Sequence, residues 1–186
     1  LALRGKSEKT FGLKGKRAKV PEGLHSNFYK FGNEFILNSD LASVKWYGRG
    51  PHENYIDRLE SADIGLYEST PKDLFTLYAR PQDNGNRTDI RWVEFSAGPE
   101  VGLLFYSDVP FNFSASHHKK EDLDSGSSKK LTQKHVRLLE PQKDIFLNID
   151  GFTSGVGCVN SWGALPLEQY RLPYDNYQYS CWLIPN

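Results

Sequence analysis

Residues 176–184, NYQYSCWLI, carry the pattern from which the fold prediction starts. One face of an extended chain would present Tyr177, Tyr179, Cys181 and Leu183, and the other face Gln178, Ser180, Trp182 and Ile184. This repeat of two is typical of a β-strand with two distinct faces. A strand is therefore predicted close to the end of the chain.

Similar short runs recur at residues 34–37, 43–47, 89–95, 101–106 and 145–150. The 16 glycines and 10 prolines recur as turn signals, and 13% of all residues are aromatic. Many short strands separated by turns predict an all-β, antiparallel sandwich. A chain of 186 residues suits one domain, so residues 1–186 are interpreted as a single β-sandwich domain.

Helical signals are few. Thr70, Pro71 and Asp73 could cap a short turn that runs into Leu74 and Phe75. Residues 119–123 favour a brief helix before the flexible segment at 125–128, and residues 5–19 suggest either an edge hairpin or a frayed terminus. None of these segments is long enough to organise the fold.

Charge and composition limit the kinds of molecule that this chain is expected to bind. The chain has 23 basic and 23 acidic residues, so no net field would draw it to nucleic acid or to a membrane. No apolar run approaches the roughly 18 residues of a spanning helix, and LALRGKSEKT lacks the order of a secretion signal. We therefore expect a soluble protein. Because the sequence contains no Met, we interpret it as a fragment of a longer chain. Its compartment, cytoplasmic or periplasmic, stays open. Cys158 and Cys181 could form one bridge, but two free thiols are favoured.

Two polar segments invite a functional interpretation. Residues 81–87, PQDNGNR, are either a tight loop or a polar loop beside a carbohydrate, whose hydroxyls planar amides can match. Residues 46–58, WYGRGPHENYIDR, contain possible acids and bases, but a retaining glycosidase needs two carboxyl groups about 5 Å apart. Loop salt bridges formed by Arg49, Asp57 and Arg58 are the favoured interpretation.

A third segment, residues 155–163, reads GVGCVNSWG and places three glycines around Asn160, Ser161 and Trp162. Such a loop can present an indole that stacks on the apolar face of a pyranose. Burial of Trp162 in the core is the alternative, and the flanking glycines favour exposure. The motifs of phosphate-binding loops, serine hydrolases and zinc proteases are missing, and the adjacent His117 and His118 make a poor metal pair.

Together, residues 46–58, 78–92 (YARPQDNGNRTDIRW) and 147–163 (LNIDGFTSGVGCVNSWG) resemble, in order, signature stretches of the C-terminal domain of LacZ-type β-galactosidases. Residues 111–124 and 177–185 fit the same pattern, so the resemblance runs from about Phe31 to the end and leaves the register of residues 1–30 open. It implies a galactose-mutarotase-like β-supersandwich, the fifth domain of a family 2 glycoside hydrolase.

The resemblance also implies a role. Both catalytic glutamates would lie in a (β/α)₈ barrel outside this chain, so the fragment alone is expected to be inactive and contains no catalytic residue. Trp162 would form the platform for the aglycone sugar, supported by Ser161 and Asn160. The family usually has Gly and Asp where this chain has Cys158 and Val159, which could change aglycone preference. The full enzyme would use magnesium and sodium at the barrel, with no metal ligand assigned here.

The expected partners are a galactoside and the enzyme's own barrel and N-terminal domains, in a homo-oligomer. Two alternatives stay open. An independent carbohydrate-binding module would have no barrel upstream, and a structural oligomerisation domain would bury Trp162.

Overall fold

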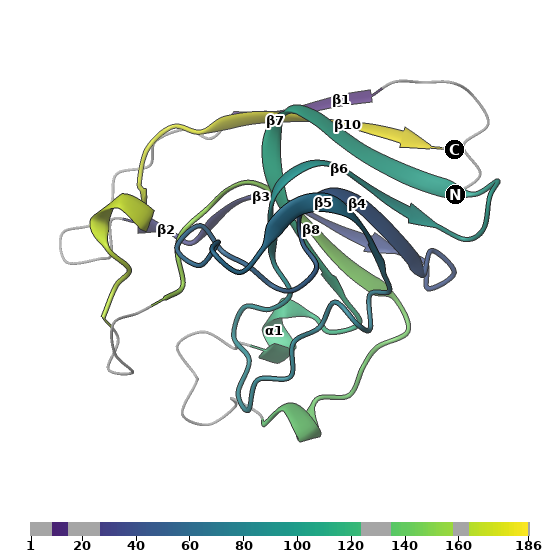
Figure 1. Cartoon of the computed structure of the whole chain (residues 1–186), viewed down its shortest axis with the longest axis horizontal. Coiled ribbons are helices and arrows are strands. Elements are labelled where there is room, and N and C mark those ends of the chain that lie inside the picture. Colours follow the sequence, from purple (N-terminus) through teal and green to yellow (C-terminus); the bar gives the residue numbers. More distant parts are fainter. Residues whose placement is uncertain (1–8, 15–26, 124–134, 158–163, 186) are drawn as a thin grey trace.

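The computed structural model describes residues 9–14, 27–123, 135–157 and 164–185. These residues form mostly strands and loops (Figure 1). The strands are β1 (Lys9–Lys14), β2 (Asn27–Phe28), β3 (Lys30–Leu37), β4 (Ser43–Gly50), β5 (Asp63–Ser69), β6 (Arg87–Ser96), β7 (Gly102–Ser116), β8 (Ile145–Thr153), β9 (Leu172–Pro173) and β10 (Gln178–Pro185). The helical segments are α1 (Lys120–Leu123) and two 3-10 turns, Val136–Leu138 and Glu168–Tyr170.

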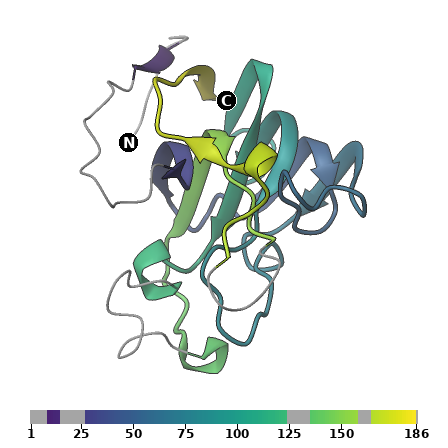
Figure 2. The same ribbon diagram turned by 90° about the vertical axis from the view of Figure 1, so that its left-hand side faces the viewer.

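One large antiparallel sheet organises the described residues. Its main path is β1-β10-β7-β6-β4-β5, while β8 pairs with β7 and β3 pairs with β8. The long strand β7 links both parts: Leu103 to Tyr106 pair with β10, and residues 112–116 pair with β8. The turned view in Figure 2 shows β7 and β8 running side by side. Strands β2 and β9 form a separate pair.

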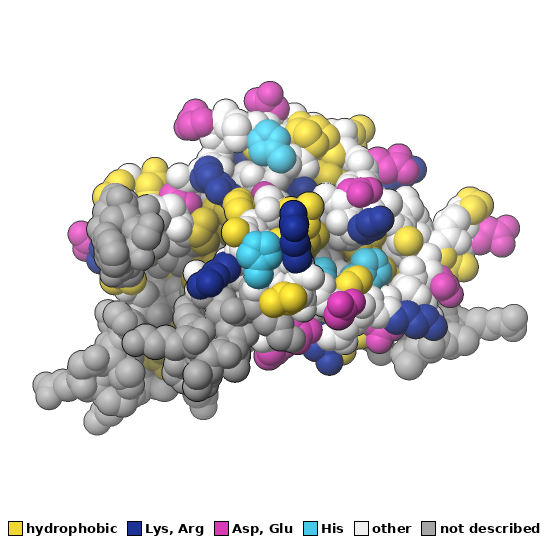
Figure 3. Space-filling view, turned by 90° about the horizontal axis from the view of Figure 1, so that it is seen from below, with side chains coloured by type: hydrophobic (Ala, Val, Ile, Leu, Met, Phe, Trp, Pro, Cys, Tyr) yellow, Lys and Arg dark blue, Asp and Glu magenta, His cyan; other side chains and the backbone are white. Residues whose placement is uncertain are grey.

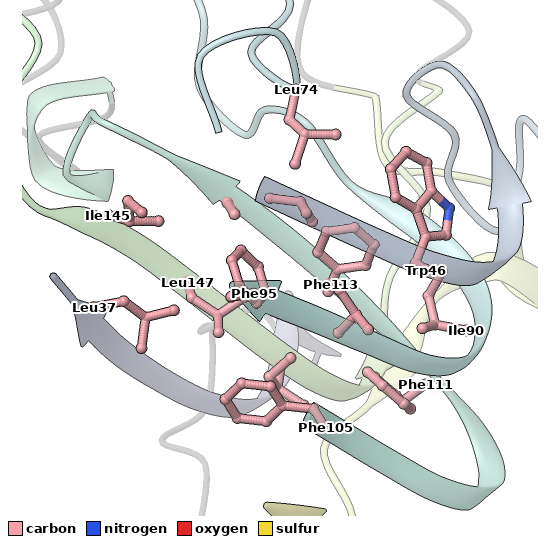
Figure 4. Packing of buried hydrophobic residues seen from close by; sticks show 14 of the residues in the cluster. Leu37, Trp46, Leu74, Ile90, Phe95, Phe105, Phe111, Phe113, Ile145 and Leu147 are labelled. Carbon is pink, nitrogen blue, oxygen red and sulfur yellow. The ribbon is translucent and has the colours of Figure 1, made fainter. Parts of the chain in front are cut away.

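The sheet folds over a single core of buried apolar side chains. Phe35 from β3 meets Phe105 from β7 with ring centroids 5.2 Å apart, and Trp46 meets Phe113 edge-on at 5.6 Å. Figure 4 shows Trp46, Phe105, Phe113 and other core side chains converging from several strands. Each fully buried side chain of this kind contributes roughly 1.5–3 kcal/mol. The predicted all-β, antiparallel sandwich is confirmed.

The predicted strands are confirmed and are mostly longer than expected. In β10, Cys181 is buried and Tyr179 and Leu183 pack against the core, so the alternation read from residues 176–184 holds. Strand β5 was not predicted, because it has apolar side chains on both faces: Tyr67 packs against the core, while Ile64 and Leu66 are exposed on the other face. Alternation between polar and apolar residues is therefore lost in it.

The helical predictions also hold where the structure describes them. Helix α1 begins at Lys120 and ends at Leu123, and the amide of Asp73 donates to Thr70 Oγ1 (3.2 Å) in the predicted turn. Strand β1 lies at the end of the main sheet path, beside β10. The segment at 125–128 lies outside the described residues, as do the other residues of 5–19. Within the described part, no helix is long and apolar enough to cross a membrane.

Cys181 is buried and has a free thiol, as predicted. Burial raises the pKa of this thiol to about 11. Cys158 lies outside the described residues.

Candidate functional site

The anchor of the predicted sugar-binding loop is well defined. The amide of Gly157 donates to Asp57 Oδ2 (2.6 Å), and the amide of Gly155 donates to the carbonyl of Tyr170 (2.7 Å). A Cβ built on Gly155 would lie 2.5 Å from Asp57 Oδ2, and one on Gly157 would lie 3.0 Å away. A side chain at Gly155 would therefore force Asp57 to move, whereas one at Gly157 would only be tight against it.

The second oxygen of Asp57, Oδ1, is buried and has no hydrogen-bond partner among the described residues. A buried carboxylate oxygen without a hydrogen-bond partner lowers the free energy of unfolding. The exceptions found in native proteins often have a functional reason. Asp57 thus anchors the start of the loop with one oxygen.

The central residues of the predicted loop lie outside the described part of the chain. Asn160, Ser161 and Trp162, the predicted substrate-binding residues, lie outside the described residues, together with Cys158 and Val159. Their predicted roles therefore stay predictions. The described chain resumes at residue 164.

An open cavity of about 220 Å³ lies beside this anchor. Ile56, Asn112, Phe152, Tyr170 and Arg171 contribute to its walls. Tyr170 also accepts the amide of Gly155, so the cavity and the loop anchor share a wall. Its walls combine apolar and aromatic side chains with amide and guanidinium groups.

Two charges of the segment at 46–58 form salt bridges as predicted, whereas Asp57 forms none among the described residues. Arg49 pairs with Asp89 (2.6 Å) and Arg58 pairs with Glu53 (2.5 Å). Asp57 binds backbone instead of either arginine. Spacing along the chain misleads here because Asp57 meets a segment 100 residues away.

Glu53 is buried and holds two loops together. Its Oε1 accepts from Arg58 and from the hydroxyl of Tyr78 (2.5 Å each), and its Oε2 accepts from the amide of Gly85 (2.6 Å). Burial and the bond to Glu53 raise the pKa of Tyr78. Both carboxylate oxygens are thus engaged in contacts that hold neighbouring loops together.

The segment at 81–87 proves to be a tight, buried loop. The side chain of Asn84 bonds both the amide and the carbonyl of Thr76 (2.7 Å each). Arg87 donates to the carbonyls of Leu74, Gly85 and Pro51, and burial lowers its pKa to about 10. These groups bind backbone, which supports the tight-loop interpretation over the carbohydrate one.

A buried ion cluster lies nearby. Lys30 Nζ lies 3.0 Å from Asp83 Oδ1 and 3.5 Å from Asp150 Oδ2. Burial acts to lower the pKa of Lys30, but the two carboxylates outweigh it and the pKa is raised. Burial raises the pKa of Asp150, and Lys30 opposes that shift. Lys30 therefore offsets only part of the charge of the two carboxylates, and its contact with Asp83 is the shorter one.

The adjacent His117 and His118 have different surroundings. His117 Nδ1 lies 3.1 Å from the carbonyl of Asp144, and His118 packs on the ring of Phe75 at 4.5 Å. No group of three or more metal-binding side chains occurs among the described residues. In Figure 3 the visible face carries charges of both signs interspersed with hydrophobic side chains.

Comparison with known proteins identifies the family. The profile described as "Beta galactosidase small chain" matches residues 6–183. This chain belongs to the β-galactosidase small-chain family. The match reaches residue 6, further towards the N-terminus than the resemblance read from sequence motifs.

Curated relatives agree with the small-chain assignment. The chain is 38% identical to a β-galactosidase of Vibrio cholerae over 136 residues, which is 73% of this chain and 12% of that protein. It is 31% identical to one of Leuconostoc mesenteroides (81% and 14%) and 29% identical to one of Priestia megaterium (90% and 16%). This chain thus matches less than a fifth of the length of each of these relatives.

Proposed function

We propose that this chain is the C-terminal β-sandwich domain of a retaining, LacZ-type β-galactosidase of glycoside hydrolase family 2. The complete enzyme would hydrolyse terminal, non-reducing β-D-galactosides. The observation that carries the proposal is the small-chain match over residues 6–183, supported by relatives named β-galactosidase. A galactose-mutarotase-like supersandwich is the corresponding fold proposal, in keeping with the antiparallel sheet.

In this proposal the domain does not carry out the chemistry. The catalytic glutamates lie in a barrel elsewhere in the enzyme, and the isolated domain is inactive. The engagement of Glu53 with Arg58, Tyr78 and Gly85 supports this division. We assign the magnesium and sodium ions of the enzyme to that barrel, and propose that the enzyme forms a homo-oligomer.

The domain's contribution is the loop that carries Trp162, with Asn160 and Ser161 beside the indole. The hydrogen bond from Gly157 to Asp57 supports this role, because a stacking platform must be held by rigid neighbours. The indole would stack on the aglycone sugar, so that binding energy from the non-reacting part of the substrate orients the bond to be cleaved.

The test is kinetic and uses the complete enzyme. Trp162→Ala should weaken aglycone or acceptor binding by about 1–3 kcal/mol, the scale of a lost stacking partner. Trp162→Phe keeps an aromatic face and should recover most of that loss. Hydrolysis of lactose and transfer to sugar acceptors are measured for both variants. Unchanged kinetics in Trp162→Ala would refute the role of the loop.

A further inference from the structure

Five large side chains form a line across the outer face of the main sheet. Cross-strand pairing places Leu66 (β5) opposite Tyr47 (β4), and Tyr47 opposite Trp92 (β6). Trp92 lies opposite Tyr106 (β7), which lies opposite Trp182 (β10). We call these five residues the aromatic row. Figure 1 shows the strands that carry it lying side by side.

The aromatic row lies on the face that points away from the core. Successive residues of a strand point to opposite faces. The chain neighbours of row residues, Trp46, Val93, Phe105 and Cys181, are all buried in the core cluster. Tyr47, Trp92, Tyr106 and Trp182 therefore project from the other side of the same sheet.

Part of this row is open to solvent. Leu66 is 73% exposed, Tyr47 39% and Tyr106 37%, whereas Trp92 and Trp182 are half-buried. Five strands about 4.8 Å apart give the row a length of roughly 19 Å. Single exposed hydrophobic residues are ordinary, but a continuous apolar strip of this length marks a surface that contacts something.

Charged groups border the row. Lys45 pairs with Glu68 at 3.7 Å in the next row of the sheet, and the guanidinium of Arg91 lies 5.6 Å from the ring centroid of Tyr47. The hydroxyl of Tyr106 bonds the carboxylate of Asp108. An aromatic centre rich in Tyr and Trp, bordered by charge, has the composition of a protein–protein interface.

We propose that the aromatic row is the surface on which the remainder of the β-galactosidase packs. This inference rests on the proposed function. More than four fifths of the length of each cited relative lies outside the region matched by this chain, because the match covers 12–16% of it. A domain of an enzyme of that size must be held against its other parts, and the row offers a large apolar strip for that contact.

The test is cysteine labelling in the complete enzyme. Leu66→Cys and Tyr106→Cys are compared with Leu77→Cys, because Leu77 (79% exposed) matches Leu66 but lies in a loop away from the row. Maleimide modification at each site is followed by peptide mass spectrometry and normalised to the unfolded enzyme. The row sites should react on the order of tenfold more slowly than the loop site, since reactivity follows access.

Two results would overturn the inference. One is labelling of the row sites at the rate of Leu77→Cys. The other is a disulfide between Tyr106→Cys residues of two copies, which would make a second copy the occupant.

Galactoside hydrolysis by the same preparations separates the two proposals. If the enzyme is active but the row sites are labelled freely, the docking inference alone is wrong. If the row sites are protected but the enzyme hydrolyses no β-galactoside, the proposed function is wrong.

A second pair of variants tests assembly. Leu66→Lys should reduce the domain's protection from proteolysis in the complete enzyme, because a charge would be buried without a partner. Leu77→Lys is the matched control and should leave that protection unchanged. Equal behaviour of the two variants would contradict the docking inference.

Discussion

Asp57 and Gly157 are joined by a hydrogen bond of 2.6 Å although they lie 100 residues apart in the chain. The bond links the turn after β4 to the segment that follows β8. The close approach also favours glycine at 155, since a side chain there would collide with the Asp57 carboxylate, and leaves little room for one at 157.

Removing this carboxylate should loosen the loop anchor. Asp57→Ala deletes a charge-assisted hydrogen bond, and we expect the free energy of unfolding to fall by about 1–2 kcal/mol. In the complete enzyme we expect poorer use of sugar acceptors. The exposed Asp63→Ala is the control. Urea unfolding and transfer kinetics check the prediction, which fails if both variants behave alike.

Filling the space beside Asp57 should also destabilise the protein. Gly155→Ala places a Cβ 2.5 Å from Asp57 Oδ2 and 3.0 Å from Tyr170 Cβ, and overpacking of this kind costs about 1–3 kcal/mol. In an Asp57→Ala background the same substitution should cost less. A double-mutant cycle measures this coupling. Strictly additive effects would contradict the proposed contact.

Two glutamates in ion pairs should differ sharply. Glu53 is buried and also binds Gly85, so Glu53→Ala should lower stability by about 2–4 kcal/mol. Glu68, whose side chain is 64% exposed in its pair with Lys45, is the matched control, and Glu68→Ala should cost no more than about 0.5 kcal/mol. Chemical denaturation compares them. Similar losses would show that burial does not decide the difference.

Alkali should destabilise the fold through its buried tyrosines. Burial, and then the charge of Asp83, raise the pKa of Tyr55 far above its usual 10.0. Its contribution is intact below pH 10 and falls as the pH rises further, because only the unfolded state then loses the proton. The loss is about 1.4 kcal/mol per pH unit for each such group. Tyr55→Phe should make the decline shallower in urea titrations between pH 9 and 11. An unchanged slope would contradict this.

Much of the sheet could be predicted because strand periodicity is local. Tyr179 and Cys181 follow the alternation read from the sequence, and the core strands β4, β6 and β8 were placed from similar runs. Strand β5 and the second half of β7 were missed. In β5 the apolar Ile64 and Leu66 project outward on an edge strand, so polarity does not separate its two faces. In the second half of β7 the buried Phe111 and Phe113 alternate with polar residues, so a strand was predictable there.

The site was predicted less completely. The sequence indicated the importance of the glycine-rich segment at 155–163 but not its anchor at Asp57, because no local signal reports a contact between residues so distant along the chain. Trp162, Ser161 and Asn160 remain predictions for the kinetic experiment.

The sequence by itself determined the all-β class, the faces of the core strands and the likeness to β-galactosidases, since each depends on residue order within short segments. Only the tertiary structure decided which charges pair, that Glu53 and Arg87 hold loops together, and that Tyr47, Trp92, Tyr106 and Trp182 form one row. The physical reason is strand register: pairing between strands brings side chains from separate segments into contact, and no single segment contains that information.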